Sequence, residues 1–268
     1  MRRALTHLAL FDLIFIFILS LSSLFGAIVG EIVYYLAFII PVGLAFLLRK
    51  NAGVEIKPPR FSMSGKNIAL TIPTIPITLA LIFLVSWITS LILSLIGDGS
   101  VSDVSGNIVT VILKHALLTA LLEEMLFRYI PLAYLANISK RGAVLFSAIF
   151  FALAHCNLYQ LPYAFVAGII FAALDIAFDS VLPSLLIHFV NNLMSVFWIR
   201  GSSNPRFVLI YASVLFALAL ISLVPIVIMR RKYRESLSPV FIDKTKLKVP
   251  IEAVLFMVMT LVIAVTNL

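Results

Sequence analysis

Apolar runs of about 20 residues recur along almost the whole chain, and they constrain the fold more than any other feature. A run of that length is what an α-helix needs to cross the hydrocarbon core of a bilayer. The runs lack the alternation of polar and apolar residues over about ten positions that is typical of membrane β-barrels. The sequence therefore predicts an all-α, polytopic transmembrane helical bundle with eight or nine spans, at approximately 8–27, 29–48, 68–96, 108–138, 142–156, 160–178, 181–199, 207–229 and 249–267.

The overall composition supports a membrane location. Hydrophobic residues make up 62% of the 268-residue chain and charged residues only 12%, against about 25% charged residues in ordinary soluble domains. No low-complexity tract, internal repeat or soluble segment interrupts the apolar runs, so we expect residues 1–268 to form a single integral-membrane domain. Arg2 and Arg3 before an apolar run imitate a signal peptide. Because no small-x-small cleavage site follows, we expect a retained helix.

The basic residues are distributed unevenly among the predicted loops. With a cytoplasmic N-terminus and nine spans, the cytoplasmic side receives sixteen of the 20 Lys and Arg: Arg2, Arg3, Arg49, Lys50, Lys57, Arg60, Lys66, Lys140, Arg141, Arg230, Arg231, Lys232, Arg234, Lys244, Lys246 and Lys248. The loop at 97–107 then lies outside, with Asp98 and Asp103 and no basic residue. This positive-inside pattern predicts a multi-pass protein of the cell (plasma) membrane with its N-terminus in the cytoplasm. It also explains the net charge of +8 without nucleic acid, and the basic loops can in addition contact anionic headgroups of the lipid bilayer.

Charged and strongly polar residues inside the spans need a reason, because a charge near the bilayer centre costs at least about 2.5–3.5 kcal/mol. We find these residues concentrated in three segments, within Leu122–Arg128, Phe151–His155 and His188–Asn192. Each segment lies on a different predicted helix. Phe151 precedes His155 by one helical turn and can pack beside it.

Helical spacing places several of these side chains on common faces. Glu124 and Arg128 are four residues apart and can form an ion pair. Glu123 is turned about 100° from Glu124 around the helix axis, so it can face a cavity instead. His188 and Asn192 share a face by the same four-residue spacing.

A Glu, two His and an Asn that converge inside a bilayer form a polar chamber, and three kinds of chemistry fit it: hydrolysis, a metal site or a proton path. Peptide hydrolysis needs a general base that activates water and donors that stabilise the oxyanion. A carboxylate and an imidazole supply the base, and an Asn amide is a donor of the kind found in oxyanion holes. Hydrolysis therefore explains all the residue types present.

The three motifs together resemble the CPBP family, which comprises type II CAAX prenyl endopeptidases, bacteriocin-processing enzymes and abortive-infection membrane proteins. The family pattern is Glu-Glu-x-x-x-Arg, then Phe-x-x-x-His, then His-x-x-x-Asn or Asp, each on its own helix. This chain matches it, in order and spacing, over approximately 108–200, the expected catalytic core. The matching residues are Glu123, Glu124, Arg128, Phe151, His155, His188 and Asn192.

The resemblance implies an intramembrane endopeptidase and a role for each motif. Glu123 and His155 would activate the attacking water, and His188 and Asn192 would form the oxyanion site. Supporting roles would fall to Glu124, Arg128 and Phe151. The chain departs from the pattern at Tyr129, where many relatives carry Gly, and this puts the space around the first motif in doubt. The implied substrate is a membrane peptide or protein, of which prenylated CAAX termini are one kind, and we expect access from the cytoplasmic half.

The catalytic type stays open, since the family has been described both as metalloproteases and as glutamate-dependent. The chain has no His-Glu-x-x-His zinc motif. Zinc held by Glu123, His155 and His188 is nevertheless an alternative, because Glu and His are ordinary zinc ligands. We favour water activation without a metal and expect no cofactor.

Two other functions, and purely structural roles for some of these residues, remain as alternatives to the endopeptidase. A proton-coupled transporter fits intramembrane Glu and His, although no internal repeat appears. A non-catalytic membrane scaffold is the other alternative. The Glu124–Arg128 pair can serve helix packing alone, and we expect the remaining polar residues of the core to be structural or solvated, with no catalytic role: Lys114, His115, Cys156, Asp175, Asp179 and Asn191.

Overall fold

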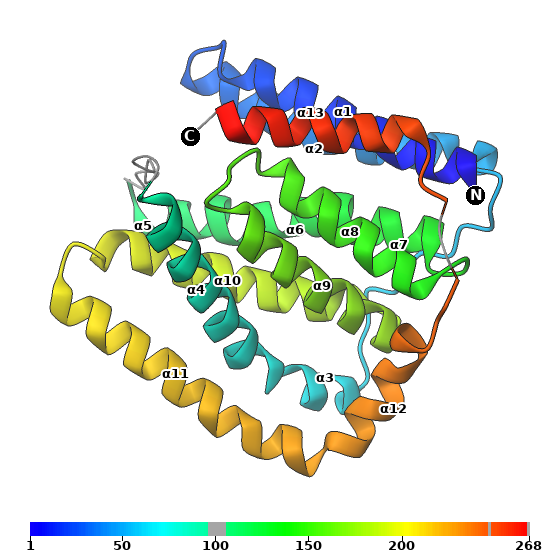
Figure 1. Cartoon of the computed structure of the whole chain (residues 1–268). Coiled ribbons are helices and arrows are strands. Elements are labelled where there is room, and N and C mark those ends of the chain that lie inside the picture. Colours follow the sequence, from blue (N-terminus) through cyan, green and yellow to red (C-terminus); the bar gives the residue numbers. More distant parts are fainter. Residues whose placement is uncertain (96–105, 246–247, 267–268) are drawn as a thin grey trace.

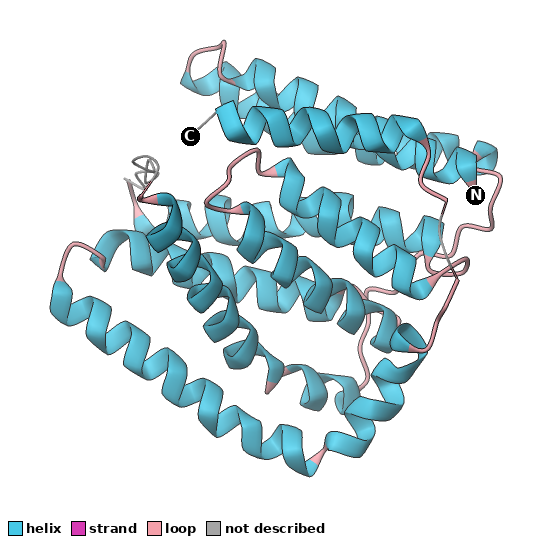
Figure 2. Ribbon diagram, viewed as in Figure 1, coloured by secondary structure: helices cyan, strands magenta, loops and turns pink. Residues whose placement is uncertain are grey.

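The computed structural model describes residues 1–95, 106–245 and 248–266. Within these residues the chain is built from helices joined by short connections, and an isolated bridge between Arg60 and Ser180 is the nearest approach to a strand pair (Figure 2). The predicted all-α class is confirmed. The predicted outer loop residues Asp98 and Asp103, and the basic residue Lys246, lie outside the described ranges.

The helices follow the predicted apolar segments closely (Figure 1). Pro73 lies between two helices, Gly65–Thr71 and Thr74–Leu93, within the third predicted segment. In chain order the helices are α1 (Arg2–Ser22), α2 (Ala27–Leu48), η1 (Arg49–Asn51), α3 (Gly65–Thr71), α4 (Thr74–Leu93), α5 (Ile108–Val111), η2 (Ile112–Leu118), α6 (Thr119–Glu124), η3 (Met125–Tyr129), α7 (Ile130–Leu135), α8 (Lys140–Ala154), α9 (Leu161–Phe178), α10 (Leu182–Gly201), α11 (Pro205–Ile228), α12 (Arg230–Phe241) and α13 (Ile251–Thr266).

The chain is an integral, multi-pass membrane protein. Six helical stretches of the described chain are long and apolar enough to cross a bilayer: Arg2–Ser22, Ala27–Asn51, Gly65–Leu93, Leu161–Phe178, Leu182–Gly201 and Pro205–Ile228. The predicted total of eight or nine spans stays a prediction. Nine spans would require α8, with 15 residues, and α13, with 16, to cross the bilayer together with the interrupted helix from Ile108 to Leu135, and eight spans would require two of these three.

That interrupted helix carries the first motif. It runs through α5, η2, α6, η3 and α7 without a loop, and η2 and η3 are π-helical. Asn107 caps its start by accepting hydrogen bonds from the backbone N–H groups of Val109 and Thr110. π-Helical turns are rare and are frequently found at functional sites.

Helix packing brings the three motifs together in the middle of the bundle. α1, α2 and α13 form one outer layer, α4 and α11 form another, and α8, α9 and α10 lie between them with the interrupted helix (Figure 1). α8 and α9 approach closely at Gly168, where an added Cβ would lie 2.8 Å from the Cα of Ala148. A glycine is required at this position, because a larger residue would push the two helices apart.

The connections gather at two ends of the bundle. At one end, which we call the basic end, the backbone N–H of Lys57 donates to Ala133 O at 3.1 Å, and that of Arg60 donates to Asp179 O at 3.1 Å. The basic end comprises residues 1–3, 49–64, 136–141, 179–182 and 229–245. The other end, which we call the opposite end, comprises residues 23–26, 106–107, 155–160 and 202–204 (Figure 1).

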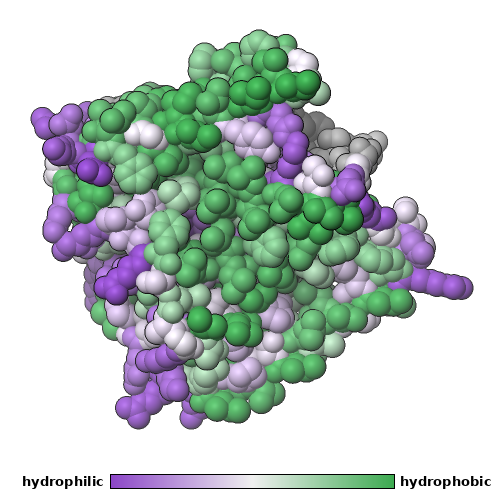
Figure 3. Space-filling view, turned by 180° about the vertical axis from the view of Figure 1, so that it is seen from behind, coloured by the Kyte–Doolittle hydropathy of each residue, from purple (hydrophilic) through white to green (hydrophobic). Residues whose placement is uncertain are grey.

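Further polar contacts secure the basic end. Asp243 accepts hydrogen bonds from Ser139 Oγ at 2.9 Å and from the backbone N–H groups of Arg141 and Thr245. These bonds, led by that from Thr245, lower the pKa of the Asp243 carboxyl well below its usual range. Hydrophilic side chains line the left edge of the molecule in Figure 3, where this end lies, beside a broad apolar face.

Candidate active site

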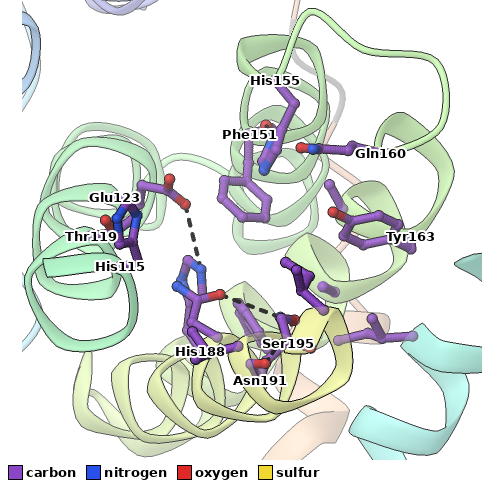
Figure 4. A pocket seen from close by; sticks show the side chains of 17 residues that line it. His115, Thr119, Glu123, Phe151, His155, Gln160, Tyr163, His188, Asn191 and Ser195 are labelled. Atoms are coloured by element: carbon purple, nitrogen blue, oxygen red, sulfur yellow. Dashed lines mark hydrogen bonds and ion pairs between the residues drawn. The ribbon is translucent and has the colours of Figure 1, made fainter. Parts of the chain in front are cut away.

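A cavity of about 290 Å³ lies between the interrupted helix, α8, α9 and α10. All four predicted catalytic residues line it: Glu123, His155, His188 and Asn192. Figure 4 labels the first three of them. The four residues come from three helical segments that are far apart in the chain, so the fold, and not the local sequence, brings them together. We call this cavity the chamber.

The His188 side chain lies between two carboxylates. Its Nδ1 lies 2.6 Å from Glu124 Oε1, and its Nε2 lies 3.4 Å from Glu123 Oε2. The shorter contact fixes the orientation of the imidazole ring, as a carboxylate commonly does for a functional histidine. His188 Nε2 is thereby directed to the same part of the chamber as the Glu123 carboxylate.

The two adjacent glutamates have different surroundings. The Glu123 side chain is 15% exposed and faces the chamber, whereas that of Glu124 is 2% exposed. Glu124 Oε2 lies 3.4 Å from Nε of Arg128, which is completely buried. The spacing predicted this pairing of Glu124 with Arg128 on one face. A buried carboxylate needs such a partner, because desolvation of an isolated charge is expensive.

Aromatic rings complete the surroundings of Arg128. Its guanidinium carbon lies 3.8 Å from the ring centroid of Phe151 and 5.2 Å from that of Phe171, distances that allow cation–π attraction. Phe151 also contacts both histidines, with ring centroids 4.9 Å from His155 and 5.6 Å from His188. Phe151 therefore separates the buried cation from the chamber and holds the imidazoles apart.

Asp175 is not solvated but has a structural role. Its side chain is fully buried on α9, and its Oδ1 accepts a hydrogen bond from the backbone N–H of Ser184 at 3.0 Å. Because Ser184 lies in the first turn of α10, Asp175 caps this helix from a neighbouring element. Asp179 is exposed, as expected, and pairs with Arg60 at 3.1 Å. We call Glu124, Arg128 and Asp175 the plug.

His155 follows directly after the last turn of α8. Its Nδ1 lies 2.8 Å from the carbonyl oxygen of Phe151 and can donate to it. With the proton on Nδ1, the other ring nitrogen is an acceptor, which is the form that can take a proton from water. His155 is thereby suited to act as a base from the α8 side of the chamber (Figure 4).

The sequence did not predict several other residues that line the chamber. Asn191, expected to serve packing, lines it and donates from Nδ2 to Asn192 Oδ1 at 3.4 Å. This contact occupies the Asn192 oxygen and leaves its amide N–H groups as donors. The further polar lining residues are His115, Thr119, Gln160, Tyr163 and Ser195.

His115 and Thr119 carried a signal that sequence reasoning overlooked. Together with Glu123 they are spaced four residues apart, so all three lie on the chamber side of the helix. Lys114, next to His115, points elsewhere and pairs with Glu31 of α2 at 2.5 Å. A further intramembrane acid, Asp12 of α1, is 4% exposed and lies outside the three motifs.

The alternative zinc ligands were Glu123, His155 and His188. Among the residues that the structure describes, no group of three or more His, Cys, Asp or Glu side chains is arranged to hold a metal ion. The choice between a metal-free and a zinc-dependent reaction therefore stays a prediction. The mechanism proposed below uses the protein's own groups.

Comparison with known proteins identifies one family. Residues 105–194 match the sequence model of the family described as "Type II CAAX prenyl endopeptidase Rce1-like". The match covers about a third of the chain and includes every residue of the three motifs. No curated protein and no solved structure matches the chain.

Proposed function

Because residues 105–194 place this chain in the CPBP family of CAAX-type membrane proteases, we propose that it is an intramembrane endopeptidase that uses Glu/His-activated water. Its substrate is a membrane-associated or prenylated CAAX-type peptide. The observation that carries this proposal is that Glu123, His155, His188 and Asn192 all line one chamber. A single peptide bond in the chamber can then be reached by two bases and by amide and imidazole donors.

In the proposed reaction, a water molecule held between Glu123 and His155 attacks the carbonyl carbon of the scissile bond. Glu123 takes the proton from water as the new C–O bond forms. The Asn192 amide donates a hydrogen bond to the resulting oxyanion, and His188 donates a second one from Nε2 as the imidazolium, since its Nδ1–H is held by Glu124. Glu123 then gives the proton to the leaving nitrogen as the C–N bond breaks, which releases an acid and an amine.

Glu124 and Arg128 act through other residues and do not touch the substrate. Glu124 holds His188 Nδ1 at 2.6 Å, and Arg128 balances the charge of Glu124. These contacts position the imidazole ring toward the chamber. Loss of this support by a shift of about 1 Å would be expected to lower the rate markedly.

The decisive experiment is metal analysis of the pure protein together with cleavage of a library of membrane peptides, with and without a chelator. We expect cleavage that resists the chelator, is lost in Glu123→Gln and occurs without bound metal. Stoichiometric zinc with chelator sensitivity would overturn the metal-free mechanism. Failure to cleave any peptide, with no phenotype of Glu123→Gln in cells, would overturn the enzyme itself.

The two alternative functions predict different results. A proton path needs aqueous access from both faces of the membrane, but the fully buried Arg128 and Asp175 lie between the chamber and the basic end. Measured pH-dependent proton flux in liposomes would favour the transporter over the endopeptidase. A scaffold would keep its full biological effect in the double variant Glu123→Ala/His155→Ala.

The distribution of basic residues also supports a proposed orientation in the cell (plasma) membrane. The N-terminus and the basic end would face the cytoplasm, because short cytoplasmic loops carry the excess of Lys and Arg. The exposed basic residues of α12, Arg230, Arg231, Lys232 and Arg234, would then lie near anionic lipid headgroups.

A further inference from the structure

The residues that line the chamber are not spread evenly along their helices. On the interrupted helix they are His115, Thr119 and Glu123, which all precede the plug residue Glu124. On α9, which begins at the opposite end, they run from Tyr163 to Phe171. On both of these helices the lining residues therefore lie in the half that is nearer the opposite end.

α8 and α10 run in the opposite direction, because both begin at the basic end. Their lining residues accordingly lie toward the C-terminal end of each helix. α8 contributes Phe151 near its last turn, and His155 follows directly. α10 contributes residues from His188 as far as Ile199, near its last turn. No described residue of the basic end lines the chamber.

The plug closes the way to the basic end. Arg128 and Asp175 are fully buried, and every residue of α7 is buried beyond them. By contrast, Ser195 and His115 are exposed and line the chamber on its other side. A path for water from the chamber can therefore lead only toward the opposite end.

A second cavity of about 380 Å³ extends the chamber in the same direction. It shares Gln160, Tyr163, Asn191 and Ser195 with the chamber and continues between α4, α10 and α11. Aromatic rings from Trp87 and other residues line it beside these polar groups. A surface of this kind can hold an extended peptide, since amides and hydroxyls bond the backbone while rings contact side chains.

We propose that substrate enters the chamber from the opposite end, so that the enzyme acts on peptides presented at the extracytoplasmic leaflet. This inference rests on the proposed function and on the orientation given by the basic residues. It differs from the sequence-based expectation of access from the cytoplasmic half. Of the substrates proposed above, this access route selects a membrane-associated peptide on, or anchored in, the outer side of the membrane, and not a prenylated CAAX terminus displayed to the cytoplasm.

Thiol labelling can test the access route directly. Cys156 is the only cysteine of the chain, so Cys156→Ser provides a background without thiols. In this background Ser203→Cys marks the opposite end, Lys50→Cys marks the basic end, and Ser195→Cys reports on the chamber. All three native side chains are exposed. A membrane-impermeant thiol reagent is added to intact cells and, separately, to inverted membrane vesicles.

We expect Ser195→Cys and Ser203→Cys to label in intact cells and Lys50→Cys to label only in inverted vesicles. Ile199→Cys is a second chamber probe and should behave like Ser195→Cys. The proposal would be overturned if the chamber probes labelled from the same side as Lys50→Cys, if they failed to label in both preparations, or if Ser203→Cys proved cytoplasmic.

A cleavage assay extends the test to the substrate class. A membrane-impermeant peptide that detergent-solubilised enzyme cleaves should be cleaved when added to intact cells and spared by inverted vesicles. The reverse result would overturn the proposal. Labelling does not require turnover and should persist in Glu123→Gln, so its failure counts against the access route alone, whereas absence of any cleavage by solubilised enzyme counts against the proposed function.

Discussion

The two halves of the helix from Ile108 to Leu135 lie in different surroundings. The first half lines the chamber with His115, Thr119 and Glu123, whereas every residue from Ile130 to Leu135 is buried. Glu123 and Glu124 lie at the boundary, and the exposed fractions of their side chains are 15% and 2%. One continuous helix thus carries both a water-facing carboxylate and a sealed one.

This difference teaches that surroundings, more than residue type, separate the roles of two adjacent acids. A carboxylate that faces a chamber can exchange a proton with water. A carboxylate held by Arg128 and His188 can do so only by breaking an ion pair or a hydrogen bond inside the bundle. We therefore expect changes at Glu123 to affect activity alone and changes in the plug to affect mainly stability.

The largest effect is expected at Glu123. Glu123→Gln removes the proposed general base but keeps the size of the side chain and its contact with His188. We expect kcat to fall by about 10²–10⁴-fold, the usual contribution of general acid–base catalysis. Peptide cleavage in detergent or proteoliposomes measures the rate, and thermal unfolding should show an unchanged Tm.

Glu55→Gln is the matched control, because Glu55 lies in an exposed loop and pairs with Lys57 at 3.2 Å. It should keep full activity and Tm. Glu123→Gln with wild-type kcat would exclude Glu123 as the base. A large fall in Tm for Glu123→Gln would instead show that both halves of the helix are structural.

The next largest effect is expected in the plug. Arg128→Met leaves the Glu124 carboxylate buried without its guanidinium partner, and breaking a buried ion pair in this way costs about 3–5 kcal/mol. Unfolding in detergent should show a correspondingly lower stability. Part of the loss should return in Glu124→Gln/Arg128→Met, since neither charge then remains.

A double-mutant cycle measures this coupling. Residues in direct contact usually show interaction energies of about 0.5–3 kcal/mol. If the effects of Glu124→Gln and Arg128→Met on the free energy of unfolding were simply additive, the pair would not stabilise the bundle. The ion pair would then not explain why Glu124 differs from Glu123.

A smaller loss is expected on the α10 side of the chamber. Asn192→Ala removes a proposed oxyanion donor, for which losses of about 10²–10³-fold in kcat are typical. Asn191→Ala is the matched control on the adjacent residue. It removes only the 3.4 Å contact that orients Asn192, so its effect on kcat should be clearly smaller. Equal losses would exclude a specific role for Asn192.

The helical fold could be predicted from sequence, because the length and apolarity of each span are local properties of the sequence. The predicted segments 160–178 and 181–199 agree with α9 and α10 within a few residues. The π-helical turns η2 and η3 could not be predicted in this way. They depend on how one helix packs against several others, and no local pattern in an apolar run encodes that.

The members of the site were predictable to the extent that spacing and motif resemblance revealed them. The four-residue spacings in the first and third motifs predicted the pairing of Glu124 with Arg128 and the common face of His188 and Asn192. The contact of His188 with Glu124 was not predictable, because it joins α10 to a helix 64 residues away. The same holds for Asp175, whose burial depends on α10 folding back against α9.

Asp175 provides the smallest expected effect and sharpens the comparison within the plug. Its Oδ1 accepts a hydrogen bond from Ser184 N–H at 3.0 Å, and this N–H has no partner within α10 because it lies in the first helical turn. Asp175→Ala should cost about 0.5–2 kcal/mol, as loss of a helix cap does. Asp175→Asn keeps an acceptor and should cost less. Unfolding measurements on both variants separate hydrogen bonding from charge. Because both variants lack the charge and only Asn keeps the acceptor, equal losses would mean that Asp175 acts by its charge beside Arg128 and not by capping α10.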